Sequence, residues 1–137
     1  MTTRATERNQ VGYTELDPSF GGAAGALVST TADLAAFVRA FAQDRLLRPE
    51  YRALMVAPFD HGANRQYGLG VESFNALCHV QYIGHAGAVP GFGTLVATTW
   101  DGRRQVVLMT TNSLMEVPDP QHALDRLVER MLCPTGS

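Results

Sequence analysis

Strand-like segments follow one another between residues 67 and 113, and only short connections separate them. The segments read YGLGVESF, CHVQYIGH, GTLVATTW and RQVVLMTTN. Parallel strands need crossover connections of a dozen or more residues, so strands joined this closely pair as an antiparallel sheet. Gly68 and Gly70 inside the first segment are typical of a bulge or a close backbone approach. Asp101-Gly102 is a typical hairpin turn between the last two segments.

Helical patterns flank these strands on both sides. Thr30 is a typical N-cap with Asp33 three residues later, as in a capping box. A second short helix is expected to begin at Pro49, a favoured first position. The first helix would bury one apolar face, made up of Leu34, Phe37, Val38 and Phe41. The second helix would bury Tyr51, Leu54 and Met55.

A closing helix is expected near the end of the chain, with a stripe fit to lie on the sheet: Ala123, Leu124, Leu127, Val128, Met131 and Leu132. The length of 137 residues suits one domain. We expect irregular chain over 1–28, helices over 29–57, antiparallel strands over 67–113 and the closing helix over 119–133. This order indicates an α+β domain with a sheet of about three to four strands.

Charge and composition exclude several classes of partner. A net charge of −2 without a basic stripe argues against binding to nucleic acid or to an anionic membrane. No run of eighteen apolar residues is present, so we expect no membrane span, and the polar start MTTRATERNQ is unlike a signal peptide. All 11 basic residues are arginines. No mechanism in this chain can therefore use a lysine amine.

The cysteines and most histidines do not indicate a metal or a cofactor. Cys78 and Cys133 are either buried free thiols or a disulfide, which would require an oxidising compartment. His61, His79 and His122 are scattered without a metal-ligand spacing, so we expect no metal site. The glycines after the second strand-like segment precede another strand rather than a helix, which excludes a dinucleotide fingerprint. We therefore expect no cofactor.

The stretch GHAGAVPGFG, residues 84–93, is longer and richer in glycine than a hairpin turn requires. The strand that precedes this stretch is expected to end where the stretch begins, at Gly84. His85 is flanked there by glycines that leave the backbone open to a ligand. Backbone N–H groups in such a place can stabilise an oxyanion.

The order STTADL, YGLGV, GHAGAVPGF, a DG hairpin and a strand ending in Asn112 resembles the serine β-lactamase-related family. It is most similar to class C β-lactamases and to secreted D-alanyl-D-alanine carboxypeptidases. The resemblance runs from about residue 12 to residue 133 and matches only the C-terminal part of that family's domain. It implies a partial transpeptidase-like fold and, for the intact parent, an extracytoplasmic location. The implied substrate is a peptide, an ester or a β-lactam-like small molecule.

The resemblance also implies roles for individual residues. His85, Ala86 and Gly87 fall on the third active-site motif, and the backbone N–H of Ala88 falls on an oxyanion donor. Glu72 and Phe92 are expected beside the substrate, and exposed apolar surface is expected next to Tyr82, His85 and Phe92. Some secreted members bond a cysteine before this strand to one at the end of the last helix, which implies the pair Cys78–Cys133.

Two further motifs of that family, S-x-x-K and Y-x-N, do not occur in this sequence. A serine without a positioned base is a poor nucleophile, so we expect this chain alone to be inactive and to need a complementary N-terminal half. The resemblance places Ala86 and Ala88 where carboxypeptidase members often carry hydroxyls that bind the substrate's terminal carboxylate. The alanines favour an esterase, amidase or aminopeptidase-like parent, unless this subgroup tolerates alanine there and still binds peptides. The alternatives are a free-standing non-catalytic binding module derived from that family and a different catalyst built around His85.

Overall fold

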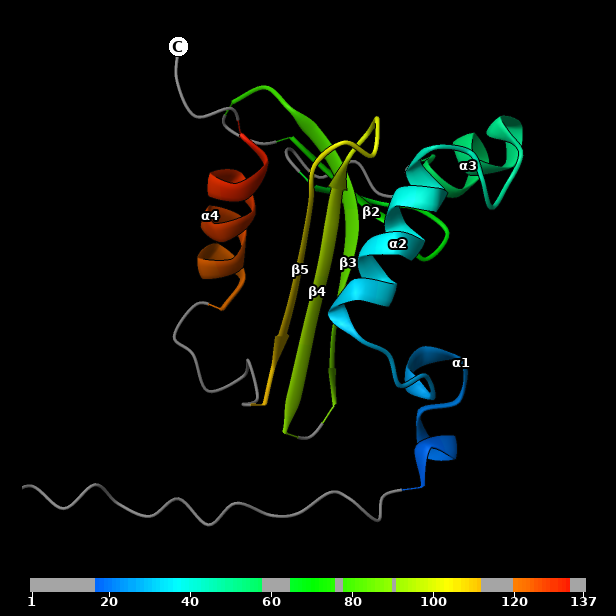
Figure 1. Ribbon diagram of the computed structural model, residues 1–137, viewed down its shortest axis with the longest axis vertical. Helices are drawn as coiled ribbons and strands as arrows, with labels where there is room; N and C mark the ends of the chain where they lie inside the picture. Colours follow the sequence, from blue (N-terminus) through cyan, green and yellow to red (C-terminus); the bar gives the residue numbers. More distant parts are fainter. Residues whose placement is uncertain (1–16, 58–64, 76–77, 90, 112–119, 134–137) are drawn as a thin grey trace, which may run out of the picture.

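The computed structural model describes residues 17–57, 65–75, 78–89, 91–111 and 120–133. A central antiparallel sheet has helices on both faces, with α4 (Pro120–Leu132) on one side and α2 (Thr31–Ala42) on the other (Figure 1). The chain is therefore an α+β domain, as expected. Among the described residues no helix is long and apolar enough to cross a membrane.

The segment before α2 is not irregular over its described part, contrary to our expectation. It forms the 3₁₀ turn η1 (Pro18–Gly21) and the single helical turn α1 (Gly22–Gly25). Asp17 caps η1 by accepting a hydrogen bond of 2.9 Å from the backbone N–H of Ser19, and this bond lowers the pKa of Asp17. Leu27 and Val28 follow with 94% and 93% exposure, so no described element covers them.

Helix α2 begins as predicted, because Thr30 accepts a hydrogen bond of 3.1 Å from the backbone N–H of Asp33. In a full capping box the Asp33 side chain would accept from the backbone N–H of Thr30. Here the Asp33 carboxylate accepts instead from the Thr30 hydroxyl, over 2.9 Å. Val38 and Phe41 are buried, whereas Phe37 is 59% exposed. The expectation for Phe37 is wrong because only a narrow stripe of α2 meets the sheet.

Helix α3 (Pro49–Val56) begins at Pro49, as predicted. The expected burial is wrong for Tyr51 and Leu54, which are 46% and 60% exposed. The Tyr51 ring stacks under the exposed Arg48 guanidinium, whose Cζ lies 4.7 Å from the ring centroid. Tyr51 therefore faces outward. Met55 is partly buried against a second buried cluster, formed by Phe41, Ala42 and Ile83.

The sheet has five strands rather than three or four, in the order β1-β2-β3-β4-β5. The strands are β1 (Arg65–Tyr67), β2 (Glu72–Asn75), β3 (Gln81–Val89), β4 (Phe92–Thr99) and β5 (Gln105–Thr110). Each pairs with its neighbour in an antiparallel register.

The additional strand arises because YGLGVESF is a hairpin and not one strand. Tyr67 pairs with Glu72, and Gly70 has a φ of +73° in the turn between them. A Cβ on Gly68 would lie 2.1 Å from the carbonyl oxygen of Met55, so the turn packs directly on the end of α3. The backbone N–H of Leu69 donates to the same oxygen over 2.8 Å.

Strand β3 also differs from the prediction at both ends. It starts at Gln81 rather than at Cys78, and His79 before it has a φ of +58°. It does not end near Gly84 but continues to Val89, which pairs with Phe92. Only residues 90 and 91 separate β3 from β4, so most of the glycine-rich stretch belongs to strands.

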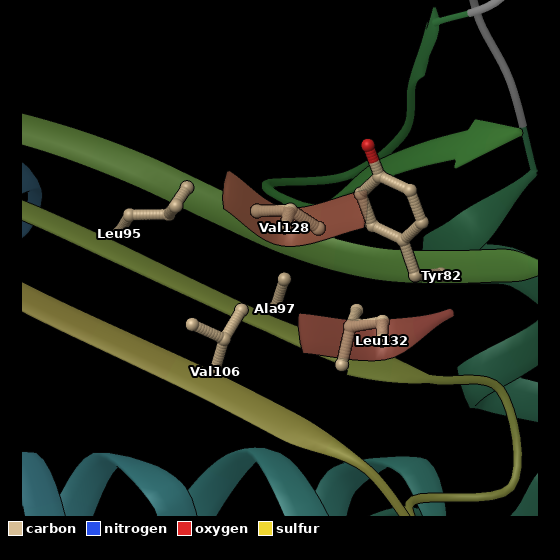
Figure 2. Close-up of a cluster of buried hydrophobic side chains, with 6 residues drawn as sticks. All are labelled: Tyr82, Leu95, Ala97, Val106, Val128 and Leu132. Atoms are coloured by element: carbon tan, nitrogen blue, oxygen red, sulfur yellow. The ribbon is translucent and has the colours of Figure 1, made fainter. Parts of the chain in front are cut away.

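One face of the sheet packs against α4, as predicted (Figure 2). The buried cluster combines strand residues with two from the helix: Tyr82, Leu95, Ala97, Val106, Val128 and Leu132. Tyr82 is only 4% exposed and stacks on Phe74, so it does not border an exposed cleft as expected. Full burial of a side chain such as Leu132 contributes about 1.5–3 kcal/mol. The expectation is wrong for Met131, which is 57% exposed and so does not lie on the sheet.

The disulfide Cys78–Cys133 joins the segment before β3 to the residue after α4, with a Cα–Cα distance of 5.9 Å. This confirms the pairing implied by the resemblance. The bond closes 55 residues of chain, which in the chain-entropy model stabilises the fold by about 4 kcal/mol.

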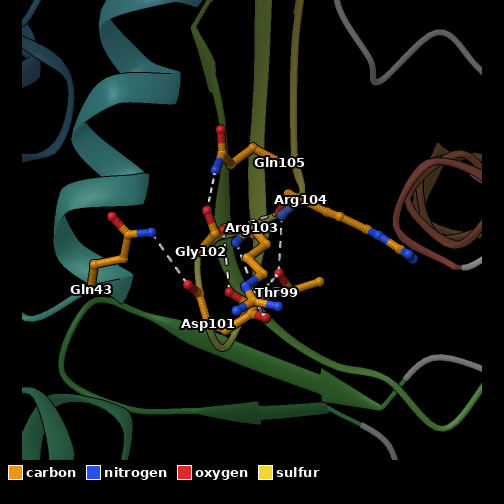
Figure 3. A network of polar contacts seen from close by, with 8 residues as sticks. Gln43, Thr99, Asp101, Gly102, Arg103, Arg104 and Gln105 are labelled. Atoms are coloured by element: carbon orange, nitrogen blue, oxygen red, sulfur yellow. Dashed lines mark hydrogen bonds and ion pairs between the residues drawn. The ribbon is translucent and has the colours of Figure 1, made fainter.

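The predicted Asp101-Gly102 turn is present within the connection 100–104 (Figure 3). The Asp101 carboxylate accepts bonds from the Thr99 hydroxyl, 2.6 Å, and from the Arg103 backbone N–H, 3.0 Å. These bonds, led by the one from Thr99, lower the pKa of Asp101. Arg104 donates to the carbonyl oxygen of Leu132 over 2.8 Å and ties the turn to α4.

Candidate active-site strand

The second half of β3 pairs with a described strand on one edge only. Strand β2 pairs with β3 from Gln81 to Gly84, and β4 pairs with it from Tyr82 to Val89. Over residues 85–89 no other described strand lies on the β2 side. We call this part of β3 the open segment. In an antiparallel strand every second residue directs its N–H and C=O toward the same edge, so the open segment presents backbone groups there.

Exposure changes abruptly where the open segment begins. Tyr82, Ile83 and Gly84 are buried, whereas His85 is exposed. Gly87 and Ala88 are exposed as well. The strand thus leaves the core and reaches the surface at the histidine.

Gly84 and Gly87 lie three residues apart in the strand and have different surroundings. A Cβ on Gly84 would lie 2.2 Å from the carbonyl oxygen of Val96, so the neighbouring strand requires a glycine there. A Cβ on Gly87 would meet nothing within 4 Å among the described residues. Glycine inside a strand weakens it and often marks the close approach of a ligand or another backbone. Nothing in the described packing explains the glycine at 87.

The His85 ring makes a hydrogen bond that the sequence did not lead us to expect. The Tyr67 hydroxyl lies 2.8 Å from His85 Nε2, and the two rings meet edge to face with centroids 5.8 Å apart. We missed Tyr67 because we interpreted residues 67–74 as one strand. The pair of glycines at 68 and 70 was the signal for a turn that brings Tyr67 back toward β3.

The other predicted site residues lie around the open segment. Glu72 pairs with Gly84, immediately before it, and Phe92 pairs with Val89 at its end and is 48% exposed. Ala86 is partly buried against the cluster on the α4 side. His61 and the strand end at Asn112 lie outside the described residues.

A hollow of about 760 Å³ lies at the opposite end of β3 and β4. Its lining includes His79, Trp100, Arg103 and Arg104. Arg104 and the nearby Asp101 are already engaged in the turn network, so we do not assign chemistry to this hollow. In the described part of the chain, no three His, Cys, Asp or Glu side chains are grouped so that they could hold a metal ion.

Comparison with known proteins agrees with the fold. The family model Beta-lactamase matches residues 2–129. The structure is similar to the crystal structure of a D-stereospecific amidohydrolase from Streptomyces sp., with a TM-score of 0.73 and 30% sequence identity. The match covers 87% of this chain and 34% of that chain. The chain belongs to the Beta-lactamase family.

Proposed function

We propose that this chain supplies the third active-site motif of a serine hydrolase that cleaves amides or esters. The observation that carries the proposal is the open segment, where His85 is exposed and Gly87 has free space that its own packing does not use. Membership of the Beta-lactamase family supports a hydrolase of this kind.

The open segment has the groups that such a role needs. A substrate lying along its free edge can pair with backbone groups in the manner of an added strand. Gly87 leaves room for that approach, and His85 provides a polar side chain beside it. The backbone N–H of Ala88 is the proposed donor to the oxyanion, and a donor on the backbone does not depend on the alanine side chain.

The nucleophile of this hydrolase must come from residues outside the present sequence. The chain has no lysine, so it holds no S-x-x-K motif. A serine hydroxyl without an adjacent base reacts poorly, and we therefore propose that the chain alone is inert. The missing groups would be supplied by a longer polypeptide or by a separate complementary chain.

The substrate class that fits best is an amide or an ester without a strictly required terminal carboxylate. Alanines at 86 and 88 cannot donate hydroxyl bonds, and each lost bond to a carboxylate costs on the order of 1.5–3 kcal/mol. The similar Streptomyces protein is a D-stereospecific amidohydrolase, which supports an amide substrate.

A chimera tests the proposal. This chain would replace the matched region of the Streptomyces amidohydrolase, and hydrolysis of a D-configured amide would be measured. We expect activity in the chimera and a loss of about 10- to 100-fold in kcat/KM for His85→Ala. Met131→Gln, at an exposed position on the outer face of α4, is the matched control and should leave kcat/KM unchanged. A folded, active chimera that His85→Ala does not slow would contradict the role of His85.

The isolated chain provides the complementary measurement. It should show neither ester turnover nor a covalent adduct with a fluorescent penicillin, and a labelled serine would contradict the proposal. The alternative, a non-catalytic binding module, predicts that the isolated chain binds a peptide while the chimera remains inactive.

A further inference from the structure

Tyr67 and His85 are hydrogen-bonded although 18 residues separate them in sequence. Tyr67 is the last residue of β1, and His85 is the first residue of β3 beyond its pairing with β2. The tyrosine side chain therefore reaches the histidine where the open segment begins.

Backbone contacts on two sides hold Tyr67 in place. After Tyr67 the chain turns at once, and the N–H of Gly68 donates to the carbonyl oxygen of Val71 over 2.8 Å. The next N–H, that of Leu69, donates to Met55 at the end of α3, also over 2.8 Å. Gly68 has no space for a side chain against that helix. The phenol is thus carried by a turn that is anchored on α3.

The chemistry of the two rings decides the direction of their hydrogen bond. A neutral imidazole has one N–H donor and one acceptor nitrogen, and its partner determines which is which. A phenol O–H donates better than it accepts, and an unprotonated imidazole nitrogen is a strong acceptor. Tyr67 should therefore donate to Nε2, which leaves the proton of the neutral ring on Nδ1.

We propose that Tyr67 is a positioning residue that holds neutral His85 in the Nδ1–H tautomer. Tyr67 occupies Nε2 and His85 is exposed, so in this tautomer the Nδ1 N–H can donate to a ligand beside the open segment. A group that this N–H recognises must be an acceptor, such as a carbonyl or carboxylate oxygen. This role toward a ligand rests on the proposed function, whereas the tautomer does not.

Nuclear magnetic resonance of the full chain tests the tautomer without any activity assay. The chain would be labelled with ¹⁵N in its histidines, and long-range ¹H–¹⁵N spectra would be recorded at about pH 8.5, where an ordinary imidazole is neutral. The signals of His85 would be assigned by their loss in His85→Asn. We expect a protonated Nδ1 and an unprotonated Nε2 in the unmodified chain.

Tyr67→Phe keeps the ring and removes the hydroxyl, so it should abolish the dominance of the Nδ1–H form. Tyr51→Phe is the matched control, because its hydroxyl bonds to Arg48 instead of a histidine, and it should leave the His85 spectrum unchanged. An Nε2–H form in the unmodified chain would overturn the proposal, as would an unchanged tautomer in Tyr67→Phe. If that variant does not fold, the spectrum of the unmodified chain alone decides. Failure of the chimera to hydrolyse amides would affect the proposed function and leave this result standing.

Discussion

Alanine at Gly84 and alanine at Gly87 should have opposite effects on the stability of this chain. At Gly84 the new Cβ would lie 2.2 Å from the Val96 carbonyl oxygen, and real contacts of this kind are not found under 3.0 Å. β3 and β4 would have to separate locally by roughly 1 Å, which weakens their hydrogen bonds. Overpacking of this kind together with a lost bond costs on the order of 2–4 kcal/mol.

At Gly87 the same substitution meets nothing within 4 Å. Its main effect is to restrict the unfolded chain, which stabilises the fold by about 0.4–1 kcal/mol. The two variants should therefore differ by roughly 2.4–5 kcal/mol in the free energy of unfolding, although both add one methyl group to the same strand. Urea unfolding followed by circular dichroism measures this difference.

A Gly87→Ala variant as unstable as Gly84→Ala would refute the reasoning, because the space over Gly87 would then be filled by the chain itself. In the chimera with the Streptomyces amidohydrolase, Gly87→Ala should lower kcat/KM although it does not destabilise the isolated chain. That combination is what a glycine kept for a ligand predicts.

Three further predictions follow from the described contacts. Replacing both Cys78 and Cys133 by serine should lower the free energy of unfolding by about 4 kcal/mol in urea titrations, and an unchanged midpoint would show that the disulfide does not constrain the unfolded chain. The pKa of Asp101 in the folded chain lies below its ordinary value of 3.8, so the ionised carboxylate stabilises the fold at pH values above 3.8. This stabilisation is lost as the pH falls through the pKa of the folded chain. Asp101→Asn should therefore flatten the acid dependence of unfolding below pH 3.8, and an identical profile would contradict this. Strand β5 pairs only with β4 among the described strands, so the chain should self-associate in sedimentation experiments, and Met109→Lys on this edge should reduce the association. A monomeric unmodified chain would show that the edge is closed.

Features that depend on local chemistry or on periodicity were predictable from the sequence. Thr30 caps α2 because its hydroxyl accepts a hydrogen bond from an unpaired backbone N–H within the first turn, and this depends only on residues next to one another in the sequence. Pro49 begins α3 because its ring already has the helical φ. The Asp101-Gly102 turn and the packing of α4 on the sheet follow from turn chemistry and from apolar spacing in the same way. The Cys78–Cys133 bond was predicted only from the family resemblance, because two cysteines in a sequence leave their pairing open.

Features that depend on contacts between distant segments were decided by the tertiary structure alone. Position 68 needs a glycine because the end of α3 leaves no space for a side chain there, and that helix lies more than ten residues earlier in the chain. The exposure of Tyr51 and Leu54 depends on which side of α3 meets the sheet, which helical spacing does not specify. The candidate site shows the same division. The glycine-rich stretch around His85 is visible in the sequence, but the bond between His85 and Tyr67 exists only because the hairpin folds back onto β3.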